Sequence, residues 1–166
     1  MYRVAVCDDC IKDGRQIFQW AEQIFAERKM EVALSLFHSP QDLLAQVTNR
    51  NRQYDLLLLD ILMGETSGIQ LAQALRENGS RAKLIYITIS RDYAIDGYKV
   101  QANDYLVKPI EKEMLDASIG RILDRHDSVL VEADGGLQPV LVSAVQYCEA
   151  DGHYVILRLD GQAEPS

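Results

Sequence analysis

Five apolar, strand-like stretches alternate with amphipathic ones over the first 125 residues of this 166-residue chain. The strand-like stretches span residues 2–7, 31–37, 54–60, 83–90 and 104–108. Strands that are apolar throughout, joined by short connections to helices, favour a parallel sheet with helices on both faces. The pattern therefore predicts an α/β fold class with a five-stranded parallel sheet.

Helical periodicity marks the segments between these strands. We expect a helix at each end of this region, a helix that starts at Ser39, one capped by Ser67 and stopped by Asn78-Gly79, and a short helix over 92–99. The first helix should bury the stripe Ile17, Trp20, Ala21, Ile24 and Phe25. The last should bury Met114, Leu115, Ser118, Ile119 and Ile122, ending near Arg125.

The pattern changes near residue 128, where four shorter strand-like runs begin. They span 129–133, 139–142, 145–150 and 153–159, with turn dipeptides at 134–135, 151–152 and 160–161, of which the last two suit hairpins. The net charge is −2 over residues 1–126 and −6 over 127–166, where Arg158 is the one basic residue. This acidic tail lacks the clustered Lys and Arg of a nucleic-acid surface. We predict a domain over 1–125, a linker over 126–128 and a β-rich segment over 129–166.

Composition excludes some classes of protein and some sites. The sequence has no run of eighteen apolar residues, so we expect no membrane span, and its first residues do not resemble a signal peptide. Three cysteines favour a reducing, cytoplasmic location over a disulfide framework. His38, His126 and His153 are isolated in the sequence and suggest no metal cluster.

Polar residues lie at the ends of four of the five predicted strands. The first strand ends in Asp8 and Asp9, the third in Asp60 and the fifth in Lys108, and Thr88 lies near the end of the fourth. Ligands in parallel α/β sheets bind at the carboxyl ends of the strands, so we expect these groups to converge on one cleft. Clustered carboxylates resist full ionisation, and a hard cation such as Mg²⁺ (or Mn²⁺) relieves their repulsion.

A carboxylate beside a metal ion and a lysine is suited to attack phosphorus. The two cations can neutralise the oxygens of the transferring group, and Thr88 could hydrogen-bond the new phosphoryl group. Each aspartate alone could be a helix cap or turn former, but three of them with Lys108 favour a site.

Cys7 and Cys10 have the spacing of redox and zinc sites, but the surroundings argue against both. Cys7 ends a predicted strand, adjacent anions raise a thiol pKa, and Cys148 is the only other cysteine. We therefore interpret Cys7 as a core residue. Cys10 is interpreted as a helix-entry residue without assigned chemistry.

Four motifs together resemble the receiver domain of two-component response regulators. They are "VAVCDD", "LLLLDILMGETSG", "LIYIT" and "VQANDYLVKPI", and the resemblance covers residues 1–125. It implies a flavodoxin-like (βα)5 fold, with Asp60 as phosphoacceptor and Lys108 as the phosphate-binding lysine. It also implies Mg²⁺ ligation by Asp9, Asp60 and the Leu62 carbonyl with Asp8 nearby, a Thr88–Tyr105 switch pair and a cis Lys108–Pro109 bond.

One residue differs from the usual residue of the receiver family, and two segments resemble a particular subfamily. The fourth residue after the acceptor is commonly proline, whereas here it is Gly64, which predicts a more mobile loop. Residues 92–110 resemble receivers joined to LytTR-type (LytR/AlgR-like) DNA-binding domains, and 139–161 resemble the start of such a domain. We expect either a truncated chain or a naturally shortened regulator, with DNA bound only by a full-length parent.

The resemblance implies a phosphorylation switch and not an enzyme, apart from slow hydrolysis of its own acyl phosphate. A sensor histidine kinase or small phosphodonor would supply the phosphoryl group, and the output would be transcriptional. The alternative is a stand-alone adaptor. A phosphohydrolase is disfavoured because position 10, two residues after Asp8, is cysteine and not a second acid. A homodimer could form through the fourth helix, fifth strand and fifth helix, or through the β tail with its unpaired edges.

Overall fold

The computed structural model describes residues 1–50, 52–90 and 102–124, together with four strands beyond residue 127. The chain divides into two compact units, Met1–Ile122 and Leu123–Ser166. We call them the N-terminal unit and the C-terminal unit and describe each by itself.

A five-stranded parallel sheet forms the centre of the N-terminal unit, as predicted. Its strands are β1 (Tyr2–Cys7), β2 (Val32–Phe37), β3 (Leu56–Leu59), β4 (Lys83–Thr88) and β5 (Asp104–Val107). They lie in the order β2-β1-β3-β4-β5, and every adjacent pair is parallel. β1, β3, β4 and β5 are therefore consecutive neighbours, which brings their carboxyl ends to one edge of the sheet.

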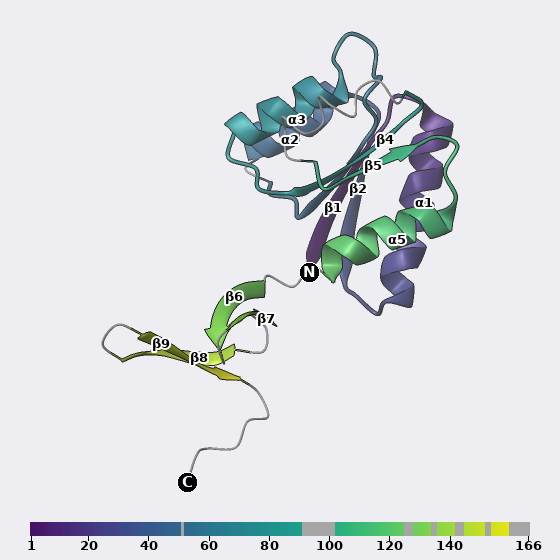
Figure 1. The fold of residues 1–166 in the computed structure, drawn as a ribbon. Helices are drawn as coiled ribbons and strands as arrows, with labels where there is room; N and C mark the ends of the chain where they lie inside the picture. The colour runs from purple at the N-terminus through teal and green to yellow at the C-terminus, as the bar shows by residue number, and fades with distance from the viewer. Residues whose placement is uncertain are drawn as a thin grey trace. The chain divides into compact units, whose positions relative to one another are not determined.

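Helices cover both faces of this sheet. They are α1 (Ile11–Glu27), α2 (Pro40–Arg50), α3 (Gly68–Glu77) and α5 (Lys112–Leu123). Figure 1 shows α1 and α5 on one face and α2 and α3 on the other. Ser67 caps α3 through a capping box with Gln70, and Asn78 ends the helix, as the sequence predicts. The expected helix over 92–99 lies outside the described residues.

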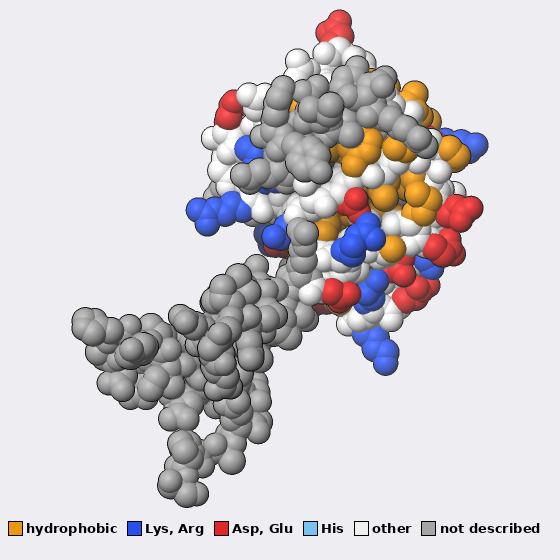
Figure 2. Space-filling view, in the orientation of Figure 1, with side chains coloured by type: hydrophobic (Ala, Val, Ile, Leu, Met, Phe, Trp, Pro, Cys, Tyr) orange, Lys and Arg blue, Asp and Glu red, His pale blue; other side chains and the backbone are white. Residues whose placement is uncertain are grey.

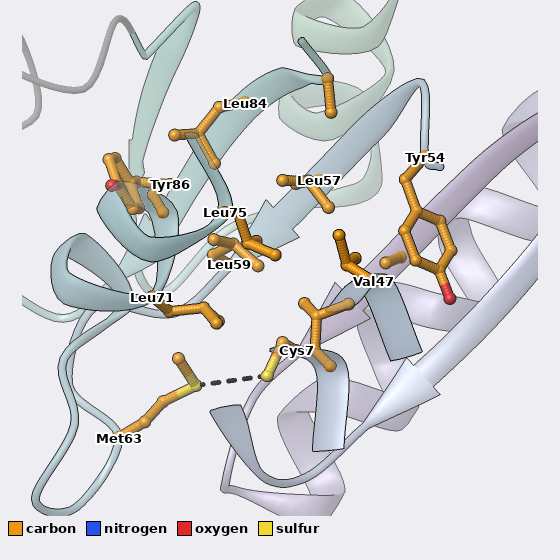
Figure 3. Close-up of a cluster of buried hydrophobic side chains, with 14 of the residues drawn as sticks. Cys7, Val47, Tyr54, Leu57, Leu59, Met63, Leu71, Leu75, Leu84 and Tyr86 are labelled. Carbon is orange, nitrogen blue, oxygen red and sulfur yellow. Dashed lines mark hydrogen bonds between the residues drawn. The ribbon is translucent and has the colours of Figure 1, made fainter. Parts of the chain in front are cut away.

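The core beneath α2 and α3 is built from the inner faces of β1, β3 and β4. Leu57, Leu59, Leu84 and Tyr86 are at most 2% exposed there. Cys7 belongs to the same cluster, and its thiol donates to the Met63 thioether across 3.7 Å (Figure 3). The interpretation of Cys7 as a core residue is confirmed.

Two apolar residues expected in helical core stripes are not buried. Trp20 is only partly buried on α1, whose buried stripe includes Gly14 instead. Met114 is 41% exposed, because the face that α5 buries begins at Leu115. Both residues lie at the margin of their apolar stripe, where helical spacing alone does not separate core from surface.

The C-terminal unit contains two antiparallel strand pairs. β6 (Ser128–Ala133) pairs with β7 (Gly136–Leu141), and β8 (Val145–Asp151) pairs with β9 (Tyr154–Leu159). The β-rich character is confirmed. Ala133 pairs with Gly136, so β6 and β7 also form a hairpin, which the sequence predicted only at the two later turn dipeptides. The dipeptide at 160–161 lies outside the described residues.

The structure was also searched for helices that could cross a membrane. Among the described residues, none combines the required length and apolar character.

Candidate functional site

Four predicted polar residues lie at the carboxyl edge of the parallel sheet. Asp8 and Asp60 directly follow β1 and β3, Thr88 ends β4, and Lys108 directly follows β5. Neighbouring strands are in register there, with Cys7 opposite Leu59 and Thr88 opposite Val107. The strand order thus brings side chains as distant in the sequence as Asp8 and Lys108 to one edge of the sheet.

Lys108 is the centre of the charged cluster. Its ammonium nitrogen lies 2.8 Å from Asp8 Oδ2, 2.9 Å from Asp13 Oδ2 and 3.2 Å from Asp60 Oδ2. The Lys108 side chain is 11% exposed, and those of Asp8 and Asp60 are 1% and 8% exposed. Largely desolvated charge-assisted hydrogen bonds of this kind are among the stronger polar contacts in a protein.

Burial and pairing act in opposite directions on these groups. Burial lowers the pKa of Lys108, but hydrogen bonds to Asp8 and Asp13 and the charge of Asp60 outweigh it, so the pKa lies above its ordinary value. Burial raises the pKa of Asp8, and the Lys108 contact only partly offsets it. The hydrogen bond from Lys108 lowers the pKa of Asp13. Lys108 is therefore a permanent cation among competing carboxylates.

Three carboxylates at this edge could hold a metal ion. One oxygen atom each from Asp8, Asp9 and Asp60 lies within 4.8 Å of the others. Asp9 is exposed whereas Asp8 and Asp60 are buried, so the group is open to solvent on one side. This oxygen-only set fits Mg²⁺, which keeps several waters beside a few carboxylates. Leu62 lies in the following loop, where its N–H donates to Asp60 Oδ1 at 3.1 Å.

Thr88 and Tyr105 lie on the adjacent strands β4 and β5. Thr88 is fully buried, and its hydroxyl has no hydrogen-bond partner within the described part of the chain. An unpaired buried hydroxyl is costly, so it is ready to bond an incoming acceptor. The Tyr105 hydroxyl donates to the Ser90 carbonyl. The Tyr105 ring packs edge-on against the Tyr86 ring, with 6.3 Å between the two ring centroids.

The loop between β3 and α3 depends on two glycines. Gly64 has φ +55°, a conformation that the fixed φ of proline forbids, so the usual family residue would not fit this backbone. A Cβ on Gly68 would lie 2.0 Å from the Asp60 carbonyl oxygen. Glycine there allows the first turn of α3 to approach the Asp60 backbone closely. The predicted mobility of the Gly64 loop stays a prediction.

A cleft of about 320 Å³ adjoins Lys108 on the α1 side of the sheet. Its lining residues are Asp13, Gln16, Ile17, Trp20, Ile89, Lys108, Pro109 and Ile110. Figure 2 shows hydrophobic side chains gathered on this side of the N-terminal unit. The partial exposure of Trp20 thus reflects its place on a cleft wall. The Lys108–Pro109 bond beside it is cis, as predicted.

Sequence reasoning missed two contributors to this edge. Asp13, in the first turn of α1, is the third carboxylate on Lys108. The available signal was an acid four residues after Asp9. His38 Nδ1 lies 2.9 Å from the Asp8 carbonyl oxygen, a contact that no spacing in the sequence revealed.

The two cysteines near the site have different surroundings. Burial, followed by the charges of Asp8 and Asp9, raises the pKa of Cys7 to about 12, which opposes thiolate chemistry. Cys10 is exposed and is the N-cap of α1, and its backbone N–H donates to Asp8 Oδ1 at 2.9 Å. Cys10 also offers its sulfur within 4.8 Å of oxygens of Asp8 and Asp13. His126 and His153 lie outside the described residues.

Solved structures with this fold include response regulators. The response regulator DrrB of Thermotoga maritima is 23% identical, with a TM-score of 0.63, and the match covers 80% of this chain and 57% of that one. A two-component response regulator from Clostridium difficile is 19% identical, with a TM-score of 0.65, over 77% of this chain and 100% of that one. At these identities the likeness shows the shared fold.

Curated proteins with similar sequences include named bacterial regulators. The transcriptional regulatory protein PcoR of Escherichia coli is 29% identical over 130 residues, 77% of this chain and 54% of that protein. DltR of Streptococcus agalactiae is 30% identical over 122 residues, 72% of this chain and 52% of that protein. The sensory transduction protein LytR of Staphylococcus epidermidis is 32% identical over 69 residues, 42% of this chain and 27% of that protein. The chain thus spans about half or less of these relatives.

A family model assigns most of the N-terminal unit. Residues 9–120 match the response regulator receiver domain, a range that includes Asp60, Thr88 and Lys108. The chain therefore belongs to the response regulator receiver domain family.

Proposed function

We propose that this chain is a phosphorylation switch in which Asp60 accepts a phosphoryl group. The observation that carries the proposal is the Asp60 carboxylate, buried beside Asp8 and Asp9 and hydrogen-bonded to Lys108. Lys108 holds a positive charge where an anionic group would transfer. Membership of the receiver family supports the same reading.

The transfer replaces one bond to phosphorus with another. A carboxylate oxygen of Asp60 attacks phosphorus and forms the new P–O bond, while the bond from phosphorus to the donor breaks. The donor is a phosphohistidine of a sensor kinase or a small acyl phosphate, and its leaving group takes the electron pair of the broken bond. The product is an acyl phosphate, which water can hydrolyse slowly. We therefore propose a signalling protein with at most slow autodephosphorylation.

A divalent cation fits the carboxylates that would hold it. Asp9 and Asp60, with Asp8 nearby and the Leu62 carbonyl, are the proposed ligands of Mg²⁺ or Mn²⁺. When bound, such an ion supplies charge neutralisation for the transferring oxygens. Lys108 supplies the protein's own positive charge, and Asp8 anchors the Lys108 ammonium through its 2.8 Å contact.

Thr88 and Tyr105 would relay the change at Asp60. A phosphoryl oxygen gives the unpartnered Thr88 hydroxyl an acceptor, and movement of Thr88 alters the end of β4. Tyr105 lies on the neighbouring strand with its hydroxyl on the Ser90 carbonyl, so a shift there changes the contact it makes. Either state then presents a different surface to partners, or to a second copy of the chain.

The proposed output is transcriptional control. Relatives named as transcriptional regulators support it, as does the LytTR-like pattern of residues 139–161. In a longer parent protein, a LytTR domain would bind DNA. The acidic tail favours the second candidate, an adaptor that acts through proteins alone. Salt-sensitive, sequence-specific binding of DNA by this chain in a mobility-shift assay would reject the adaptor.

The direct test is phosphorylation by acetyl phosphate with Mg²⁺, followed by intact mass. Wild-type protein should gain one phosphoryl group that alkali removes, and EDTA should prevent the gain. Asp60→Asn should gain none, whereas Asp55→Asn, an exposed acid at the opposite end of β3, should behave as wild type. A modified Asp60→Asn protein would contradict the site, and an unmodified wild type would contradict the function.

A further inference from the structure

Each of the three N–H donors of the Lys108 ammonium group can be assigned to a carboxylate in this structure. An ammonium group has three donors, and three carboxylates lie within 3.2 Å of its nitrogen. Two of them, Asp8 and Asp60, belong to the candidate metal group. The third, Asp13, comes from the first turn of α1 and has no role in the transfer described above.

A phosphoryl group on Asp60 would compete with the carboxylates for the N–H donors of this ammonium group. A phosphoryl oxygen that bonds Lys108 must take a donor now held by a carboxylate. Asp8 is 1% exposed, so leaving it unpaired would strand a buried charge, whereas Asp13 is 40% exposed and can be solvated by water. Asp13 is therefore the partner that Lys108 can leave at the lowest cost.

We propose that Asp13 is a positioning residue that retains Lys108 in the unphosphorylated protein and yields it to the phosphoryl group. This inference rests on the proposed function of Asp60. Asp13 acts against transfer in two ways: it competes for a lysine donor, and its negative charge repels an anionic phosphodonor. Asp8 still holds Lys108 when Asp13 is neutralised, so the lysine stays in place.

The proposal predicts faster phosphorylation when the Asp13 charge is removed. Asp13→Asn should react with acetyl phosphate about two- to fivefold faster than wild type, as expected for loss of a partly exposed ion pair. The gain should be smaller with phosphoramidate, which carries less negative charge than acetyl phosphate. Release of the Lys108 donor should accelerate both reactions, whereas a merely structural effect of the substitution would not be reversed by Asp13→Glu.

Two variants serve as controls in the same Mg²⁺-containing assay. Asp13→Glu keeps a carboxylate that can reach Lys108 and should return both rates to near the wild-type values. Glu22→Gln removes one negative charge from an exposed position of α1 outside the site and should leave both rates unchanged. Initial rates follow from the time course of the intact mass.

The outcomes separate this inference from the function on which it rests. Wild type that is phosphorylated, with Asp13→Asn equal to it or slower than it, or with Asp13→Glu as fast as Asp13→Asn, overturns the inference about Asp13 alone. Acceleration by Glu22→Gln to the same extent also overturns it, because general charge would then suffice. Wild type that gains no phosphoryl group from either donor overturns the proposed function and this inference together.

Discussion

Cys7 and Asp8 are neighbours in the chain and equally buried, at 0% and 1% exposed, yet their surroundings differ completely. Cys7 faces Met63 and the leucines of β3, where burial itself is the stabilising contribution. Asp8 faces Lys108 and Asp60, where burial is a cost that pairing must offset. Within one residue, the carboxyl end of the sheet thus changes from a region stabilised by packing to one that bears an electrostatic cost.

Substitutions that remove a similar number of atoms should have different effects in the apolar core and at the charged edge of the sheet. Removing atoms from the core loses contacts and leaves a cavity. Removing a charge from the edge changes the electrostatic energy of the groups that remain. Whether they are stabilised or destabilised depends on which charge is lost. The core should therefore respond mainly in stability, whereas the edge should respond in function and in charge-dependent stability.

The largest effect is expected in the core. Leu59→Ala should lower the free energy of unfolding by about 4 kcal/mol, because Leu59 is fully buried and its loss leaves a cavity. Met114→Ala, on the exposed face of α5, should cost no more than about 0.5 kcal/mol. Urea unfolding measures both. A cost for Met114→Ala comparable to that for Leu59→Ala would contradict the burial assigned to these two residues.

Loss of the cation should be the next largest effect. Lys108→Met should cost about 3 kcal/mol, because Asp8 and Asp60 stay buried without their positive partner. The double variant with Asp60→Asn should regain part of this loss, since one unpaired carboxylate disappears. Urea unfolding of the four proteins completes the cycle. A Lys108→Met protein as stable as wild type would show that the edge bears no such electrostatic cost.

A smaller effect with a defined pH dependence is expected away from the edge. Burial raises the pKa of Asp104, but hydrogen bonds from Ser118 and Arg121 outweigh this, and the net pKa is lowered from 3.8. A lowered pKa in the folded state stabilises the protein above the unfolded pKa, and this contribution is lost as pH falls through the folded value. Asp104→Asn should cost about 1 kcal/mol at pH 7.

The pH window makes this last prediction specific. The difference in unfolding free energy between wild type and Asp104→Asn should stay constant from neutral pH to about 5 and then shrink below about 4. Ser67→Ala, which removes the α3 cap and no titrating group, is the control, and its cost should not follow this window. A difference that grows as pH falls would contradict the lowered pKa.

Much of the fold followed from the sequence because each strand and helix left a local signal. The apolar run of β3 and the Ser67 cap predicted their elements directly. Residues at the margins of a stripe, such as Trp20 and Met114, were misplaced because the tertiary partner of a helix face decides its width. Their exposure depends on neighbours distant in sequence, which periodicity does not contain.

The candidate site was predictable to the extent that its groups follow strands. Asp8, Asp60 and Lys108 follow strands of one parallel sheet, so they lie at the same edge. Their distances from one another depend on the order of those strands. Asp13 was missed because its contact with Lys108 joins a helix to a loop 95 residues later. Contacts of this kind depend on where helices sit on the sheet, and no local pattern reports that.

The identity of the phosphorylated residue is the central claim, and reductive trapping tests it most directly. Protein treated with acetyl phosphate and Mg²⁺ would be reduced with borohydride, which converts an aspartyl phosphate to homoserine, and then digested and sequenced by mass spectrometry. The account predicts homoserine at position 60 alone. Homoserine at position 8, 9 or 13, or the absence of homoserine in a protein shown to be phosphorylated, would contradict it.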